Sequence, residues 1–181
     1  MNLHDPLKFY KLFPEDLLPE WGTTHAACFD FKACLIPGTN VTVFHADNTK
    51  HNNTVGQEML SDDKGTVVPF LNIFSGERVM VPTGLIMDIP LGHSVRIHPR
   101  SGLSLKSGLV LANQEGVVDA DYVEPTFILL HNQSTSMVTI YHGDKIAQGE
   151  MITTIKYNTV ETPDKPQPKS ERTGGFGSTG R

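Results

Sequence analysis

Short apolar runs rich in β-branched and aromatic residues, separated by Gly and Pro, dominate the pattern of hydrophobic and polar positions. Residues 93–98 alternate, which predicts a strand with Val95 and Ile97 on one face and polar side chains on the other. Further strands are predicted over residues 41–44, 78–81, 126–130, 137–141 and 150–155. No segment sustains a helical stripe, although residues 103–108 allow one helical turn. Many short strands joined by Gly and Pro turns are typical of a sandwich or barrel, so the predicted fold class is all-β.

Two segments differ in composition from these strands. Residues 45–64 are polar and Asn-rich, which predicts a long surface loop or small excursion within an insertion of about residues 45–75. Its His45 and His51 are candidate metal ligands, although histidines in a polar loop are more often simply solvated. The tail is polar, spaced by prolines and glycine-rich at its end, so it lacks core-forming content. We therefore predict a β domain over residues 1–157 and a flexible arm over residues 158–181.

The overall composition narrows the classes of partner and compartment. The 181 residues suit one domain, and the formal net charge of −5 argues against non-specific nucleic-acid binding, which requires a cationic face. No apolar stretch approaches the ~20 residues of a membrane span, and residues 1–9 lack the apolar core of a signal peptide. Cys28 and Cys34 match neither a disulfide framework nor a zinc-finger pattern, so buried thiols are favoured over a bridge between them. These features predict a cytoplasmic protein.

Two internal segments carry side chains suited to phosphate and nucleoside chemistry. Residues 99–103 (Pro-Arg-Ser-Gly-Leu) offer a guanidinium, a hydroxyl and a glycine that lets the backbone approach an anion. Residues 113–122 include Asp119, a candidate general base, and Tyr122, a flat wall for a sugar. Each has a plainer explanation when taken singly: a turn that contains an arginine, and a capping or calcium-like pair of aspartates.

The glycine-rich terminus is the third candidate segment. In residues 172–180, Arg172 can clamp phosphate oxygens and Phe176 can stack on a base, while the glycines free the backbone to wrap a ligand. Composition alone favours the plainer interpretation, a disordered Gly/Ser terminus. The segment is not a Walker loop, which needs Gly-Lys-Ser/Thr between a strand and a helix.

Five segments in a fixed order give these separate signals a specific meaning. They are residues 26–33 (Ala-Ala-Cys-Phe-Asp-Phe-Lys-Ala), 99–103, 116–122 (Gly-Val-Val-Asp-Ala-Asp-Tyr), 143–148 (Gly-Asp-Lys-Ile-Ala-Gln) and 172–180 (Arg-Thr-Gly-Gly-Phe-Gly-Ser-Thr-Gly). Together they resemble the five ordered motifs of the trimeric dUTPase family. The resemblance implies a distorted β-barrel or jelly-roll, a homotrimer with swapped or shared C-terminal segments, and Mg²⁺-dependent hydrolysis of dUTP to dUMP and pyrophosphate.

The resemblance also implies roles for individual residues. Those implied to contact the substrate phosphates are Arg100, Ser101, Gly102, Gln148, Arg172, Ser178 and Thr179. Those implied to contact the nucleoside are Asn113, Gly116, Val118, Tyr122 and Phe176, the first three within a β-hairpin. Asp119 is implied to orient the attacking water. Asp30 is implied to hold water around a magnesium ion that the phosphates grip, with no direct protein ligand.

The chain also departs from the family pattern. Cys28 replaces a usual glycine, residues 123–125 (Val-Glu-Pro) replace a common Arg-Gly-Glu, and the tail motif is one residue shorter than its commonest form. The insertion is reminiscent of some phage-encoded members. Two alternatives stay open: a dCTP deaminase on the same fold, with Glu115 or Glu124 as its base, and a non-catalytic nucleotide-responsive binding protein.

Overall fold

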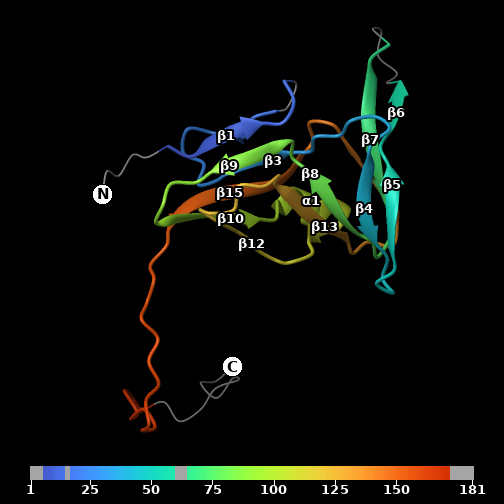
Figure 1. Ribbon diagram of the computed structural model, residues 1–181. Coiled ribbons are helices and arrows are strands. Elements are labelled where there is room, and N and C mark those ends of the chain that lie inside the picture. The colour runs from blue at the N-terminus through green and yellow to red at the C-terminus, as the bar shows by residue number, and fades with distance from the viewer. Residues whose placement is uncertain (1–5, 15–16, 60–64, 172–181) are drawn as a thin grey trace.

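The computed structural model describes residues 6–14, 17–59 and 65–171, which form short strands and one short helix (Figure 1). The strands are β1 (Lys8–Lys11), β2 (Glu20–Trp21), β3 (Phe29–Lys32), β4 (Asn40–Phe44), β5 (Lys50–Thr54), β6 (Gly56–Met59), β7 (Val67–Ile73), β8 (Arg78–Pro82), β9 (Leu85–Asp88), β10 (His93–His98), β11 (Leu109–Leu111), β12 (Gly116–Asp119), β13 (Phe127–Asn132), β14 (Val138–Tyr141) and β15 (Lys145–Thr153). The helix α1 covers Ser101–Ser107. The all-β prediction is confirmed.

The strands assemble into antiparallel sheets that wrap one core. Two sheets have five strands, in the orders β12-β10-β15-β3-β2 and β11-β13-β8-β4-β5. Two smaller sheets, β14-β7-β6 and β1-β9, share the same core, and we call the four sheets together the barrel. Its largest fully buried side chains come from all of these sheets and include Phe31, Leu71, Ile73, Leu85, Met87, Leu109, Ile128, Leu130, Ile140 and Ile146. One hydrophobic core therefore holds the sheets together.

Strand β10 follows its sequence pattern closely. Val95 and Ile97 are 0% and 4% exposed, whereas Arg96 and His98 on the other face are half-buried. The strand pairs with β12 on one side and β15 on the other, so it lies in the middle of its sheet. It ends just before Pro99, where the chain turns into α1. Gly108 closes the helix in the left-handed conformation (φ 69°), which glycine adopts without strain.

The prediction of a long surface loop over residues 45–64 was wrong. The described part of this segment contains β5, which pairs with β4 along its length, and β6, which pairs with β7. Val55, between them, is 2% exposed. Strand β7, which falls inside the predicted insertion of residues 45–75, is part of the barrel. Strand β5 escaped detection because its Lys-His-Asn-Asn-Thr sequence has no hydrophobic alternation, and polar residues suit a strand at the edge of a sheet.

After β15 the chain leaves the barrel. Residues 154–171 are exposed and form no strand or helix, and in Figure 1 this orange-to-red stretch runs away from the sheets. The division at residue 157 stays a prediction. Cys28 is half-buried and Cys34 is buried, and the two do not form a disulfide. In the described part of the chain, no helix is long and apolar enough to cross a membrane.

Candidate active site

One group of predicted site residues gathers where β3, β15 and the start of α1 meet. Asp30 on β3 lies opposite Gln148 in the β3–β15 ladder. The Asp30 Oδ1 atom is 3.0 Å from Nε of Arg100, and its Oδ2 atom is 2.9 Å from Nζ of Lys145. Gln148 donates from Nε2 to the Pro99 carbonyl at 2.9 Å. The first, second and fourth segments of the sequence therefore converge on one carboxylate.

The burial of this group favours a fixed geometry. The Asp30 side chain is 11% exposed, and the side chains of Arg100 and Lys145 are each 34% exposed. Arg100 also donates from Nη1 to the Lys145 carbonyl at 3.0 Å. A mostly buried carboxylate needs such partners because its desolvation is otherwise unfavourable. Asp30 thus holds two cations in place while each keeps a third of its surface open to a ligand.

Asp30, Arg100 and Gln148 line a cavity of about 510 Å³. Its walls include Cys28, Asp30, Arg100, Ser101, Gly102 and Gln148, together with Lys106. Burial raises the pKa of the Cys28 thiol, and the carboxylates of Glu150 and Asp30 raise it further. The cavity combines cations, a hydroxyl and a glycine with open space around it, which suits an anionic ligand. We call it the phosphate pocket.

Asp119 lies in a different place, at the end of β12. It pairs with Ser94 in the β10–β12 ladder, and its backbone carbonyl accepts from the Tyr122 amide at 3.1 Å. A cavity of about 640 Å³ is lined by Asp119, Ala120, Asp121, Leu91, Gly92, His93, Thr154 and Lys156. We call this second cavity the Asp119 pocket. The Tyr122 side chain is 44% exposed and donates to the Pro125 carbonyl at 3.2 Å.

The third segment does not form the predicted hairpin. Strand β11 pairs with β13 and β12 pairs with β10, so the turn between them joins two sheets. Asn113 lies in this turn and lines a third cavity, of about 290 Å³, with Phe44 and Arg78 among its neighbours. Gly116 packs against Ile97, where an added Cβ would lie 3.0 Å from the Ile97 Cβ, and Val118 is buried. The register of β12 with β10 is therefore set by close packing as well as by hydrogen bonds.

The single chain keeps the two pockets apart. Asp119 pairs near one end of β10, at Ser94, whereas Gln148 pairs at the other end, at His98. Four residues along a strand span roughly 13 Å. In addition, β10 lies between β12, which carries Asp119, and β15, which carries Gln148. The phosphate pocket and the Asp119 pocket share no lining residue. Within this chain, the candidate base does not face the candidate phosphate ligands.

Sequence reasoning missed several residues of these pockets. Lys145 lies in the fourth segment and pairs with Asp30 beside the phosphate pocket, a contact that no pattern in the sequence marked. Lys106, His93, Thr154 and Lys156 line the pockets without any sequence motif to mark them. The predicted residues Arg172, Phe176, Ser178 and Thr179 lie outside the described residues.

The sequence model of the dUTPase family matches residues 66–180, more than half of the chain. The chain belongs to the dUTPase family. The match covers the second to fifth segments and begins at residue 66, inside the predicted insertion of about residues 45–75. The first segment, with Asp30, lies before the match.

Relatives and solved structures agree with this membership. The chain is 46% identical over 104 residues to the deoxyuridine 5'-triphosphate nucleotidohydrolase of Dinoroseobacter shibae. The matched residues make up 58% of this chain and 66% of that protein. It is 38% identical over 119 residues to the protein of the same name from Hydrogenobaculum sp., and this match makes up 66% of this chain and 78% of that protein. The matched length is therefore just under two thirds of the first relative.

The fold is also that of solved dUTPases. The crystal structure of the Streptococcus mutans dUTPase has a TM-score of 0.60 at 22% identity and covers 83% of this chain and 98% of that chain. A Staphylococcus bacteriophage 80alpha dUTPase mutant with dUpNHpp has a TM-score of 0.67 at 18% identity and covers 98% and 99%. At these identities the likeness concerns the fold alone.

Proposed function

We propose that the chain is a dUTP diphosphatase, which hydrolyses dUTP to dUMP and pyrophosphate. Membership of the dUTPase family, with Asp119 at a strand end and a cationic pocket on the same sheet, carries this proposal. The relatives named deoxyuridine 5'-triphosphate nucleotidohydrolase support the choice of substrate. We place the activity in the cytoplasm, in keeping with two cysteines that do not form a disulfide.

The phosphate pocket binds the triphosphate in this proposal. Arg100 offers the part of its guanidinium that Asp30 does not use, while Ser101 and Gly102 offer a hydroxyl and an open backbone. The side-chain amide of Gln148 contributes at the β15 edge of the pocket. Because Asp30 and the Lys145 carbonyl already hold Arg100, little reorganisation is needed when the charge of the transition state develops.

The chemical step relies on Asp119. Its carboxylate accepts a proton from water while the water oxygen bonds to the α-phosphorus in line with the leaving group. The bond from the α-phosphorus to the oxygen bridging to the β-phosphate then breaks, and pyrophosphate leaves with the electron pair. Tyr122 supports the deoxyribose, and Asn113 with the backbone at Gly116 and Val118 reads uracil.

The residues present fit a magnesium ion held through water. Each Asp30 oxygen already faces a cation, at 3.0 and 2.9 Å, so direct ligation would break an ion pair. A carboxylate has about four acceptor sites, so Asp30 retains capacity to accept hydrogen bonds from metal-bound water. When bound, Mg²⁺ neutralises the charge of the triphosphate and fixes its geometry. A solved phage phi11 dUTPase mutant is described with a structural Mg(II) ion, which supports a place for this metal in the fold.

We also propose that the active site is shared between subunits of a homotrimer. The separation of the Asp119 pocket from the phosphate pocket in one chain supports this arrangement, because the water must touch both Asp119 and the α-phosphorus. A neighbouring chain would supply one half of the site. The exposed arm of residues 154–171 is suited to carry the terminal motif, with Arg172, Phe176, Ser178 and Thr179, over a neighbouring site.

The deaminase alternative is not favoured by the structure. Its first candidate base, Glu115, lies 3.3 Å from Arg96 Nη1 and 3.7 Å from His98 Nδ1, on the outer face of β10. Glu115 lines neither the phosphate pocket nor the Asp119 pocket. Pyrophosphate release from dUTP, dCTP and the other nucleotides tests the proposal directly. We expect release from dUTP alone, whereas ammonia release from dCTP, or no release from any nucleotide, would overturn it.

Complementation tests the shared site. Asp119→Asn and Arg100→Ala should each be inactive. Co-refolding equal amounts should restore activity at about one site in four, because each site combines half-sites from two neighbouring chains and each half-site is intact in about half of the chains. Melting curves of both variants serve as the folding control. Should the co-refolded mixture stay as inactive as its parents while forming trimers, each site must lie within one chain. A monomer mass in a fully active sample would exclude the trimer itself.

A further inference from the structure

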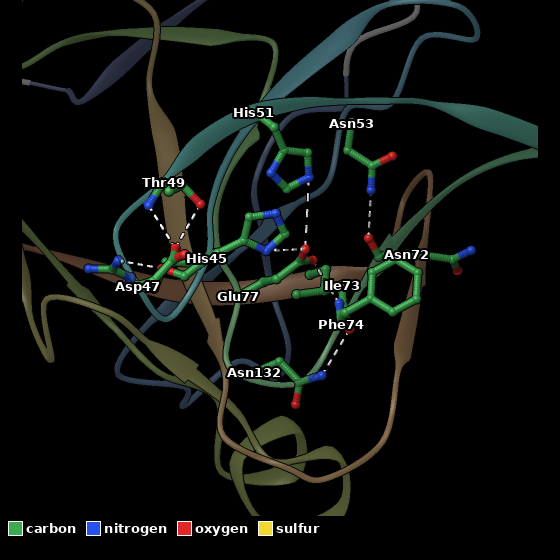
Figure 2. A network of polar contacts seen from close by, with 11 residues as sticks. His45, Asp47, Thr49, His51, Asn53, Asn72, Ile73, Phe74, Glu77 and Asn132 are labelled. Atoms are coloured by element: carbon green, nitrogen blue, oxygen red, sulfur yellow. Dashed lines mark hydrogen bonds and ion pairs between the residues drawn. The ribbon is translucent and has the colours of Figure 1, made fainter.

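A cluster of two histidines and one glutamate lies where the β4–β5 hairpin meets the turn before β8 (Figure 2). His45 directly follows β4, His51 lies on β5, and Glu77 directly precedes β8. None of the three lines the phosphate pocket or the Asp119 pocket. The dUTPase motifs do not account for these residues.

Glu77 anchors the cluster as a buried carboxylate. Its side chain is 4% exposed, and its Oε2 atom accepts from the Phe74 amide at 2.8 Å. The other oxygen, Oε1, is directed at both imidazoles, 3.3 Å from His45 Nδ1 and 3.8 Å from His51 Nε2. A buried carboxylate is unfavourable unless it is paired with a cation or well hydrogen-bonded. The second oxygen of Glu77 therefore faces two nitrogens that can each bind a metal ion.

His51 is the least satisfied member. Its Nδ1 atom is buried and has no hydrogen-bond partner among the described residues. Its Nε2 atom lies 3.8 Å from Glu77, which is too long for a hydrogen bond. Its ring stacks on His45, with centroids 4.2 Å apart and planes 12° apart. The Nε2 atom faces Glu77 without a hydrogen bond to it, so this is the nitrogen that is open to a metal ion.

The backbone that carries His45 is held firmly. The His45 amide donates to the Thr49 carbonyl at 3.0 Å, and Arg78 donates from Nη2 to the His45 carbonyl at 3.0 Å. The same Arg78 nitrogen donates to Asn48 Oδ1 at 2.7 Å, and Asp47 Oδ1 accepts from the Thr49 amide and hydroxyl. The turn is therefore organised before any ligand arrives, which favours binding.

We propose that His45, His51 and Glu77 form a binding site for a divalent transition-metal ion of the zinc type. One ligand atom from each residue lies within 4.8 Å of the others. Two ligands about 2.1 Å from zinc at a tetrahedral angle are ~3.4 Å apart, which the 3.3 Å between His45 Nδ1 and Glu77 Oε1 already matches. His51 needs only a small shift, and the His45 and His51 side chains are 47% and 36% exposed, so both have room to turn.

The donor set separates this ion from the magnesium of the proposed reaction. Imidazole nitrogens suit zinc and its neighbours, whereas Mg²⁺ prefers oxygen ligands and retains its water. The ion would join β5, the polar edge strand, to the turn before β8, and leave a fourth position for water. Its role is to fasten the β4–β5 hairpin to the barrel.

Metal binding to the full-length chain tests the proposal without any measurement of activity. After chelator treatment, wild type should bind one Zn²⁺ per chain, and Co²⁺ should give the visible absorption of a four-coordinate nitrogen- and oxygen-ligated ion. The double variant His45→Ala/His51→Ala should lose both signals. His25→Ala, which removes an exposed histidine outside the cluster, should keep them. Absence of Zn²⁺ binding by wild type, or unchanged binding by the double variant, would overturn the site.

Thermal stability provides a second readout. Zn²⁺ at a hundredfold excess over its Kd should raise the Tm of wild type by about 5–10 °C, and should leave the double variant unmoved. Without metal, the double variant should melt close to wild type, since both histidines are partly exposed. If it does not fold, the isosteric variant Glu77→Gln takes its place, and retention of full Zn²⁺ affinity in that folded variant would again contradict the proposal.

Discussion

Asp30 fixes the guanidinium of Arg100, with Oδ1 and Nε 3.0 Å apart in the wall of the phosphate pocket. The same carboxylate holds Lys145 on its other oxygen. One buried acid on β3 therefore orients two cations that come from α1's N-terminal flank and from β15. Under the proposed function, this relationship makes Asp30 a positioning residue, and we expect its loss to weaken the binding of the substrate phosphates.

Asp30→Asn should weaken dUTP binding and slow turnover, together by about tenfold or more, because a neutral amide no longer aligns Arg100 and Lys145. Stability should fall by only ~1 kcal/mol, since both cations are a third exposed and screened by solvent. Steady-state kinetics and denaturant unfolding measure the two effects. The matched control is Glu20→Gln, which removes the exposed partner of Lys32 in the same sheet and should change neither. Wild-type kinetics in Asp30→Asn would contradict the role.

Asp119→Asn should leave nucleotide affinity nearly unchanged and lower kcat by ~10²–10⁴, the usual effect of losing a general base. Single-turnover kinetics and calorimetric binding of a non-hydrolysable nucleotide separate the two quantities. Asp121→Asn changes the same functional group two residues further on and should stay within about tenfold of wild type. If the two variants behave alike, Asp119 has no special part in the chemistry.

Truncation after Thr162 should leave a folded barrel that binds dUTP weakly and hardly turns it over. The removed residues contribute no described contact to the core, so the Tm should not move. They include Arg172, and a positioned arginine on a transferring phosphoryl group can be worth ~10³ in rate. Arg172→Ala in the full chain should reproduce most of the rate loss. A truncated protein with full kcat would show that the tail has no catalytic role.

Alkylation of Cys28 should be slow and should require alkaline pH. The thiolate is the reactive form, and below the pKa its fraction falls tenfold per pH unit. Because burial and the carboxylates of Glu150 and Asp30 raise the pKa of Cys28, its rate curve should lie at higher pH than that of a free thiol in solution. Mass spectrometry after timed iodoacetamide treatment, with Cys28→Ser as control, measures this rate. A nucleotide in the phosphate pocket should slow it further, and equal rates with and without nucleotide would place the ligand elsewhere.

Gly149→Ala should destabilise the barrel by about 1–3 kcal/mol through overpacking. An added Cβ at this position of β15 would lie 2.7 Å from the Phe31 ring and 2.8 Å from the Phe29 ring, both in the core. Gly102→Ala, where nothing lies within 4 Å, is the control and should not destabilise. Urea unfolding of the two variants makes the comparison. Equal stability would mean that the two rings move aside freely.

The sequence predicted the positions of single strands better than it predicted which strands pair with each other and in which register. β10 could be read from the alternation around Val95 and Ile97, because one of its faces is apolar. The convergence of Asp30 with Gln148 depends on the register of β3 against β15, which includes a bulge between Lys145 and Ala147. Hydrophobic periodicity does not encode that register, so only the family resemblance pointed to the site.

The polar strand β5 was harder to predict from the sequence, because it too lacks a hydrophobic pattern that encodes its pairing. Residues 50–54 form β5 through backbone ladder bonds, and their side chains give no alternation of polar and apolar character. The sequence therefore indicated solvated loop residues at His45 and His51, whereas the hairpin stacks their rings on each other beside the buried Glu77. The roles of individual site residues stay predictions until the variants above are measured.

The exposed arm after β15 also sets a local concentration. Residues 154–171 span roughly 60 Å at full extension, so they confine whatever follows them to a small volume around the barrel. Short flexible tethers of this kind give effective concentrations of about a millimolar. In the proposed trimer, a terminal motif on such a tether would need only weak affinity for an occupied site in order to cover it for much of the time. The same weak affinity would let the motif leave within each cycle of the proposed reaction, so that dUMP and pyrophosphate could be released.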